Sequence, residues 1–152
     1  MLMEINDKNL HIFNNLIQLY EAEFSVITQK LPDENGRFSL DTVPEGSIKG
    51  YLWYQGKLPA GFILVDTEGK PFNVNEFYVL PCFRGNGIGE MFFFDVLKIY
   101  PGEWQVKQLQ NAIKAKQFWR KVIKKYTNDQ FKEEVYNDSY WGPVTRQLFE
   151  TK

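Results

Sequence analysis

The stretch Arg84-Gly85-Asn86-Gly87-Ile88-Gly89 separates two apolar segments, one at residues 77 to 80 and one with helical spacing at residues 88 to 100. Three glycines within five residues therefore stand where a strand gives way to a helix. Glycine has no Cβ to hold a ligand away from the main chain. The first N–H groups of a helix lack partners within the helix and carry the positive end of its dipole. The stretch predicts a site for an anion, most often a phosphate.

The residues around these glycines exclude one common phosphate motif and disfavour a second. A Walker loop needs Lys and then Ser or Thr after its last glycine, whereas Gly89 is followed by Glu90 and Met91. A dinucleotide fingerprint needs G-x-G-x-x-G and an acidic residue about 20 residues further on. This chain has G-x-G-x-G, and residues 109 to 111 contain no acid. For any such motif, the alternative is that the glycines form an ordinary tight turn that binds no ligand.

A third pattern, Arg-x-x-Gly-x-Gly, is met by Arg84, Gly87 and Gly89. It resembles the pyrophosphate motif of the GNAT family of N-acetyltransferases. The preceding Val79-x-Pro81 is similar to the junction of that family's fourth strand and third helix. The segment from 111 to 119 is similar to its later Asn-x-x-Ala-x-x-aromatic helix, with Ala115 one position displaced or Ala112 as the match.

The periodicity of apolar residues predicts the elements around these motifs. One long helix or two consecutive ones are expected over residues 8 to 30, and further helices at 87 to 100 and 111 to 125. Strands are expected at 3 to 5, 48 to 54, 60 to 66, 72 to 80, 104 to 109, 131 to 136 and 144 to 149. A strand, a crossover helix and a further strand indicate a parallel pair within a mixed sheet. We expect one α/β domain over residues 1–152: the GNAT acyl-CoA N-acyltransferase fold, with about seven strands and helices on both faces.

Composition narrows the function classes. A formal net charge of −1 and a pI near 5.9 argue against binding nucleic acid through general electrostatics. With one cysteine, Cys82, and one histidine, His11, we expect no disulfide framework, no zinc site and no Ser-His-Asp triad. No run reaches the roughly 18–20 apolar residues of a membrane span, and the first residues do not read as a signal peptide. We expect a cytoplasmic protein with no membrane partner.

The resemblance implies acetyl-CoA as the acyl donor, and the single cysteine and single histidine lead us to expect no metal. The pantetheine arm would lie along the strand at residues 77 to 79, where a bulge and a splay from the next strand leave a free N–H. That N–H would bind the thioester carbonyl and stabilise the oxyanion. Asn111 would reach the cofactor, cap the following helix, or do both. The cofactor-binding residues expected are Phe77, Tyr78, Val79, Arg84, Gly85, Asn86, Gly87, Ile88, Gly89, Glu90 and Asn111.

The attacking amine must lose a proton, because an alkyl ammonium has a pKa of about 10.4. Glu76 is the carboxylate nearest to the proposed reaction centre and the candidate base. Strand alternation puts Glu76 and Phe77 on opposite faces, although a bulge can re-aim either. Many family members carry a tyrosine acid where this chain has Trp119. An indole cannot protonate a thiolate, so Trp119 either packs beside the cofactor sulfur or belongs to the core.

The function expected is acetyl transfer to a primary amine of a small molecule or of a peptide or protein. A catalytically weak acyl-CoA sensor or subunit is the alternative, favoured by Trp119, and the glycine spacing disfavours an oxidoreductase. The acceptor, the acyl chain length and the oligomeric state stay open, with a homodimer among the partners to test. Acidic residues near the last hairpin either attract a cationic acceptor or are solvated surface: Asp129, Glu133, Glu134 and Asp138.

Overall fold

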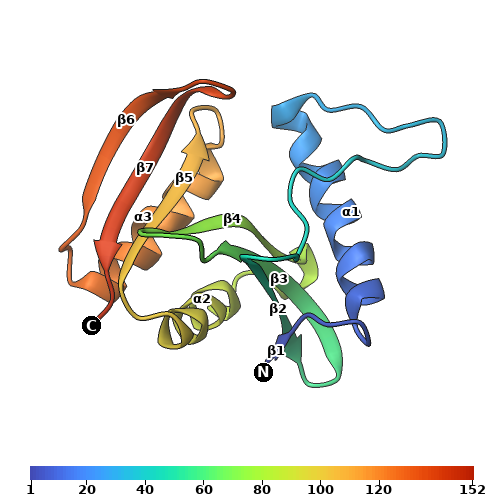
Figure 1. Ribbon diagram of the computed structural model, residues 1–152, viewed down its shortest axis with the longest axis horizontal. Coiled ribbons are helices and arrows are strands. Elements are labelled where there is room, and N and C mark those ends of the chain that lie inside the picture. The colour runs from blue at the N-terminus through green and yellow to red at the C-terminus, as the bar shows by residue number, and fades with distance from the viewer.

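One sheet of seven strands, in the order β1-β2-β3-β4-β5-β7-β6, organises the chain. The computed structural model describes residues 1–152 (Figure 1). The strands are β1 (Leu2–Glu4), β2 (Ile48–Gln55), β3 (Leu58–Asp66), β4 (Phe72–Val79), β5 (Glu103–Leu109), β6 (Lys132–Asp138) and β7 (Gly142–Glu150). The helices are α1 (Leu10–Thr28), α2 (Ile88–Ile99) and α3 (Ile113–Thr127), with a 3-10 turn, η1, at Pro81–Phe83.

The mixed sheet predicted from the sequence is confirmed. Every neighbouring pair of strands is antiparallel except β4 and β5, which are parallel. Helix α2 connects these two strands, as expected for a crossover between parallel neighbours. The predicted elements all exist, with ends that differ by a few residues at most.

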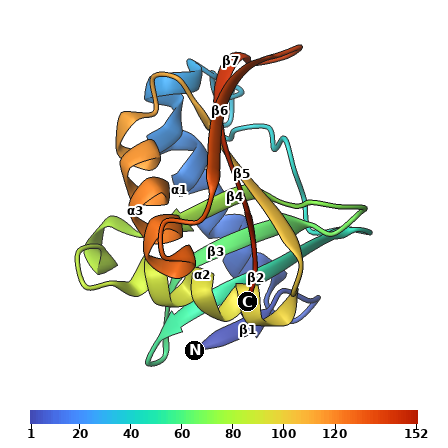
Figure 2. The same ribbon diagram turned by 90° about the vertical axis from the view of Figure 1, so that its left-hand side faces the viewer.

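Helices cover both faces of the sheet, as predicted (Figures 1 and 2). Helix α1 packs Phe13, Leu16 and Ile17 against Leu52, Phe62, Leu64 and Tyr78 of the central strands. Helices α2 and α3 lie on the opposite face over a larger cluster that includes Phe93, Trp104 and Trp119. The apolar residues of α2 surround more than one face because the helix packs against the sheet through Phe92 and against α3 through Phe94. No helix is both long enough and apolar enough to span a bilayer.

Candidate functional site

A gap opens between β4 and β5 in the middle of the sheet. The two strands pair only from Phe72 opposite Trp104 to Val74 opposite Val106, and then run apart (Figure 1). The register of β4 against β3 also shifts here, because Leu64 faces Glu76 while Val65 faces Val74. Asn75 is therefore the extra residue of a bulge, which bends a strand and increases its twist. The splay and bulge implied by the family resemblance are present.

The main chain of β4 faces this gap at Phe77 and Val79. The Leu80 N–H donates to the Ala60 carbonyl at 2.8 Å, so Leu80 faces β3. Because main-chain groups alternate along a strand, Tyr78 and Glu76 also face β3. The N–H groups of Phe77 and Val79 point the other way, toward β5, and that strand no longer pairs with them. Phe77 thus offers a main-chain donor at the edge of the gap.

The glycine turn presents bare main chain to solvent. Gly85 and Gly87 have φ of 92° and 74°, and a Cβ added to either would meet nothing within 4 Å. The N–H groups of residues 85 to 90 donate no hydrogen bond within the protein, and the first helical bond runs from the Met91 N–H to the Gly87 carbonyl at 3.0 Å. These amides lead into and begin α2, whose N-cap residue is Gly87. Such an arrangement binds anions through hydrogen bonds and the helix dipole.

The charged side chains flanking this turn are engaged elsewhere. Arg84 donates through Nε to the Val79 carbonyl at 2.8 Å and through Nη2 to Glu23 of α1 at 2.9 Å. Glu90, in the first turn of α2, forms an ion pair with Lys125 of α3. An anion at the turn would therefore meet main-chain amides before either of these side chains.

Helix α3 adds positive charge on the same face of the sheet as α2. Its residues 113 to 127 carry six cations and no acid: Lys114, Lys116, Arg120, Lys121, Lys124 and Lys125. The overall charge of −1 conceals this local excess. Charges gathered on one element attract an oppositely charged ligand more strongly than the net charge suggests.

Glu76 lies on the α1 face, opposite to Phe77, as strand alternation predicted. Its residue is 9% exposed, and burial raises the pKa of its carboxyl to about 7, a shift that a hydrogen bond with Tyr20 partly opposes. Carboxylate oxygens of Glu21, Asp41 and Glu76 lie within 4.8 Å of one another. A base with a pKa near neutrality is well matched to proton abstraction at neutral pH.

A lysine compensates two of these three carboxylates. Lys30 Nζ lies 2.8 Å from Glu21 and 3.1 Å from Asp41. The sequence analysis did not predict that Glu21, Asp41 and Lys30 gather around Glu76. Glu21 carried one usable signal, since it stands four residues after Ile17 on the buried stripe of α1, where an acid is unusual. Asp41 lies in an irregular segment whose sequence has no periodicity to place it.

Trp119 is buried in the core, one of the two alternatives considered. Its ring packs edge-on against Phe77, Phe93 and Phe118, with centroids 5.0, 4.8 and 5.1 Å away. Phe118 also explains Gly89, because a Cβ on Gly89 would lie 3.0 Å from the Phe118 ring. Gly89 permits close packing of α3 on α2, whereas Gly85 and Gly87 leave open space.

The expectation that Asn111 caps a helix is wrong. Helix α3 begins at Ile113 with Ala112 as its N-cap residue and no side-chain cap bond. The chain makes a turn after β5, in which the Ala112 N–H donates to the Leu109 carbonyl. Asn111 lies inside this turn and therefore falls one residue before the cap position. Asn111 instead lines an open pocket between the end of α1, the end of β5 and the turn before β7: Ile27, Thr28, Leu109, Gln110, Asn111, Trp141 and Pro143.

Acidic side chains near the last hairpin form ion pairs and hydrogen bonds at the protein surface. Glu133 pairs with Arg120 at 2.7 Å, and Glu134 pairs with Arg146. Asp138 accepts hydrogen bonds from the N–H groups of Tyr140 and Trp141. These contacts favour the solvated-surface interpretation over recognition of a cationic acceptor.

Comparison with known proteins identifies the fold. No family model and no curated protein matches the sequence. Among solved structures, the ribosomal L7/L12 alpha-N-protein acetyltransferase RimL in complex with coenzyme A has a TM-score of 0.69 at 12% identity, covering 99% of this chain and 93% of its own. Naa50 of Arabidopsis thaliana, with a CoA-Ac-MVNAL bisubstrate analogue, has a TM-score of 0.63 at 20% identity, covering 99% and 97%.

A GNAT-family acetyltransferase from Bacteroides thetaiotaomicron has a TM-score of 0.64 at 14% identity, covering 100% of this chain and 88% of its own. These similarities extend over almost the whole chain in each case, although few residues are identical. The seven-stranded sheet with its three helices is therefore the GNAT acyl-CoA N-acyltransferase fold.

Proposed function

We propose that this chain, which has the GNAT acyl-CoA N-acyltransferase fold, transfers an acetyl group from acetyl-CoA to a primary amine of a small molecule or of a peptide or protein. The proposal rests on the arrangement of two features around β4. The unpartnered amides of residues 85 to 90 stand at one end of the β4–β5 gap, and the buried carboxylate of Glu76 stands on the other face of β4. Neighbours of the same fold are acetyltransferases bound to coenzyme A or its analogues.

Donor binding would rest on the main chain. The pyrophosphate would accept hydrogen bonds from the amides of residues 85 to 90 at the N-terminus of α2. The pantetheine arm would add to the free edge of β4 at residues 77 to 79 as an extended strand does. Cations of α3 would offset the phosphate charge.

Direct attack then needs a base and an oxyanion donor. The amine loses a proton to Glu76, whose pKa of about 7 leaves it largely ionised in mildly alkaline solution. The nitrogen of the amine then forms a bond to the thioester carbonyl carbon, and the Phe77 N–H stabilises the resulting oxyanion. The carbon–sulfur bond then breaks as the carbonyl forms again, and the nitrogen gives up its second proton to solvent to leave a neutral amide. Because Trp119 offers no acid, the sulfur departs as a thiolate, which a thiol with a pKa of about 8.5 tolerates.

An acyl-CoA sensor or non-catalytic subunit is the second candidate. It is favoured by Trp119, which fills a core position with three aromatic neighbours where many family members place a tyrosine acid. The two candidates differ in turnover. An enzyme releases free coenzyme A only when an amine is present, whereas a sensor binds acetyl-CoA and releases none across a broad panel of amines.

The proposal includes a cytoplasmic location and chemistry without a metal. The one cysteine, Cys82, is free and exposed, as suits a reducing compartment. The acidic group most able to bind a cation already contains Lys30 between Glu21 and Asp41. Activity that survives dialysis against a chelator supports the metal-free part, and light scattering of the purified chain tests for a homodimer.

A thermal-shift comparison of acetyl-CoA, coenzyme A, ATP and NAD tests donor binding. Ligand at 100 times its dissociation constant stabilises the folded state by about 2.7 kcal/mol. We expect acetyl-CoA and coenzyme A to raise the melting temperature clearly more than NAD does. Stabilisation by NAD alone, or by none of the four, would overturn the proposed function.

A further inference from the structure

Glu23 of α1 joins the helix to the segment that leads into the glycine turn. Its carboxylate accepts hydrogen bonds from Arg84 Nη2 at 2.9 and 3.2 Å and from the Tyr78 hydroxyl at 3.2 Å. The Arg84 guanidinium lies 5.5 Å from the centre of the Tyr78 ring and donates through Nε to the Val79 carbonyl. One carboxylate thus gathers the end of β4 and the start of the turn against α1.

Arg84 is the last residue whose position is set by hydrogen bonds before the open turn. Its own N–H donates to the Pro81 carbonyl at 3.2 Å, and the next N–H that donates within the protein belongs to Met91. Gly85 and Gly87 adopt left-handed conformations without contacts on their Cβ side. The amides of residues 85 to 87 are therefore held between Arg84 on one side and the first turn of α2 on the other, so their direction depends on how firmly Arg84 is held.

We infer that Glu23 is a positioning residue for the donor site. Its carboxylate contacts Arg84 and Tyr78 and not the free amides, and it acts through Arg84 to hold the amides of residues 85 to 87, which lead into α2, in the orientation that receives a pyrophosphate. This inference rests on the proposed function. Helix α1 would then hold residues of both the donor site and the candidate base, because Glu21, two residues before Glu23, belongs to the carboxylate group around Glu76.

The test is steady-state kinetics of Glu23→Ala and Glu23→Gln, with direct measurement of acetyl-CoA binding. We expect the alanine variant to raise the KM and Kd for acetyl-CoA about three- to tenfold, since a charged hydrogen-bonding partner is lost at a partly exposed site. The glutamine variant should rescue part of this loss, because its amide oxygen still accepts from Arg84. The kcat at saturating acetyl-CoA should stay within about twofold, because no group that touches the reacting atoms is removed.

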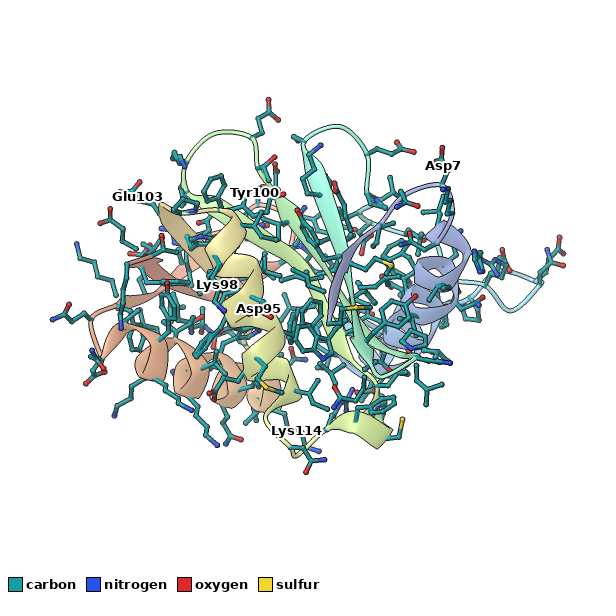
Figure 3. All side chains as sticks on the ribbon, turned by 90° about the horizontal axis from the view of Figure 1, so that it is seen from below. Asp7, Asp95, Lys98, Tyr100, Glu103 and Lys114 are labelled. Atoms are coloured by element: carbon teal, nitrogen blue, oxygen red, sulfur yellow. The ribbon has the colours of Figure 1, made fainter.

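Asp95→Ala is the matched control. Asp95 pairs with Lys98 at 2.7 Å within α2, and both side chains lie on the outer surface of that helix (Figure 3). Breaking this pair should leave the KM for acetyl-CoA unchanged. A general loss of stability, by contrast, would lower the melting temperature and the amount of active enzyme without a selective change in the KM for the donor.

A double-mutant cycle with Arg84→Met completes the test. If Glu23 acts through Arg84, Glu23→Ala adds no further loss of acetyl-CoA affinity to Arg84→Met. Additive losses would overturn the inference. So would an unchanged KM, or tighter binding by Glu23→Ala, which would mean that Glu23 keeps the guanidinium away from the phosphates. Failure of the wild-type chain to bind acetyl-CoA would overturn the proposed function instead.

Discussion

Glu76 shows how one residue is tuned by its surroundings. Glu76 and Glu68 have the same side chain, but Glu68 lies in an exposed turn while Glu76 is nine-tenths buried beside Tyr20, Glu21 and Asp41. Burial opposes ionisation, and the neighbouring carboxylates add to this effect, while Tyr20 and Lys30 counter it. The balance raises the pKa of Glu76 to about 7. A carboxyl in that range can accept and release a proton near neutral pH.

The pH dependence of turnover should report this carboxyl. Because the base must be ionised, kcat with both substrates saturating should fall as pH drops through about 7, the pKa of Glu76. Glu76→Gln should lower kcat by about 10²–10⁴-fold and remove that limb of the profile. Measurement of kcat from pH 5.5 to about 9 checks this expectation. A glutamine variant with the same kcat and the same profile would exclude Glu76 as the base.

The same carboxyl should make the fold less stable at high pH. Its folded pKa is raised from 4.5 to about 7, so between these values the folded state holds more protons and stability falls as pH rises. Above pH 7 the cost is fully present, at most roughly 3 kcal/mol. Glu76→Gln should therefore raise the free energy of unfolding at pH 8 by about 1–3 kcal/mol. Urea unfolding at pH 8 and at pH 5 measures it, and the gain should be smaller at pH 5.

At the scale of elements, β4 separates the two halves of the proposed chemistry. Alternation turns Glu76 toward α1 and Phe77 toward α2 and α3, while the bulge at Asn75 sends the strand away from β5. Gly61 of β3 secures the pairing on the other side, since a Cβ there would lie 2.2 Å from the Tyr78 carbonyl oxygen. The strand is thus held by β3 and left free on the side of the gap.

The glycine turn after β4 should bind the donor through its main chain. Gly87→Glu should abolish detectable acetyl-CoA binding, because its carboxylate would oppose the phosphates at open amides. The fold should remain, at a cost of about 1–2 kcal/mol for a side chain in the left-handed region. Isothermal titration and circular dichroism check both parts.

Gly69→Glu is the matched control for that substitution. Gly69 lies in the turn between β3 and β4 with φ of 71° and nothing within 4 Å of an added Cβ. It carries the same strain and the same charge just before the start of β4, at the opposite end of that strand from the glycine turn. Acetyl-CoA affinity should be retained in Gly69→Glu, and unchanged affinity in Gly87→Glu would remove the turn from the donor site.

At the scale of the whole molecule, the sheet joins two apolar clusters into one body. The larger cluster lies under α2 and α3, and the smaller lies under α1. Tyr78 of β4 faces the smaller cluster and its neighbour Val79 faces the larger. No linker or break in the sheet separates them, and we predict that residues 1–152 behave as one domain.

A core truncation tests this cooperativity. Phe93 is fully buried and packs against Trp104, Trp119 and Phe77. Phe93→Ala should lower the free energy of unfolding by about 3–5 kcal/mol, and unfolding should stay a single transition by far-UV and near-UV circular dichroism. Leu58→Ala, at a residue 61% exposed, should change stability little. Two separate transitions would contradict the single-domain prediction.

Local patterns in the sequence were enough to predict the order of the helices and strands and the place of the glycine turn. Apolar periodicity identified α2 and β4 because each pattern depends on neighbours a few residues away. The turn at residues 84 to 89 was readable for the same reason, since left-handed glycines and free helix amides are local features. Glu76 could be predicted as the candidate base only from its position in the sequence beside Phe77.

The surroundings of these residues depend on tertiary contacts between distant segments of the chain. Glu23 meets Tyr78 and Arg84 from 55 and 61 residues away, and Glu21, Asp41 and Glu76 come from a helix, an irregular segment and a strand. Contacts over such separations depend on how α1 packs on the sheet and where the bulge at Asn75 bends β4. No local pattern encodes that geometry, and through it burial makes one glutamate a candidate base and ion pairing makes another a proposed support for the turn.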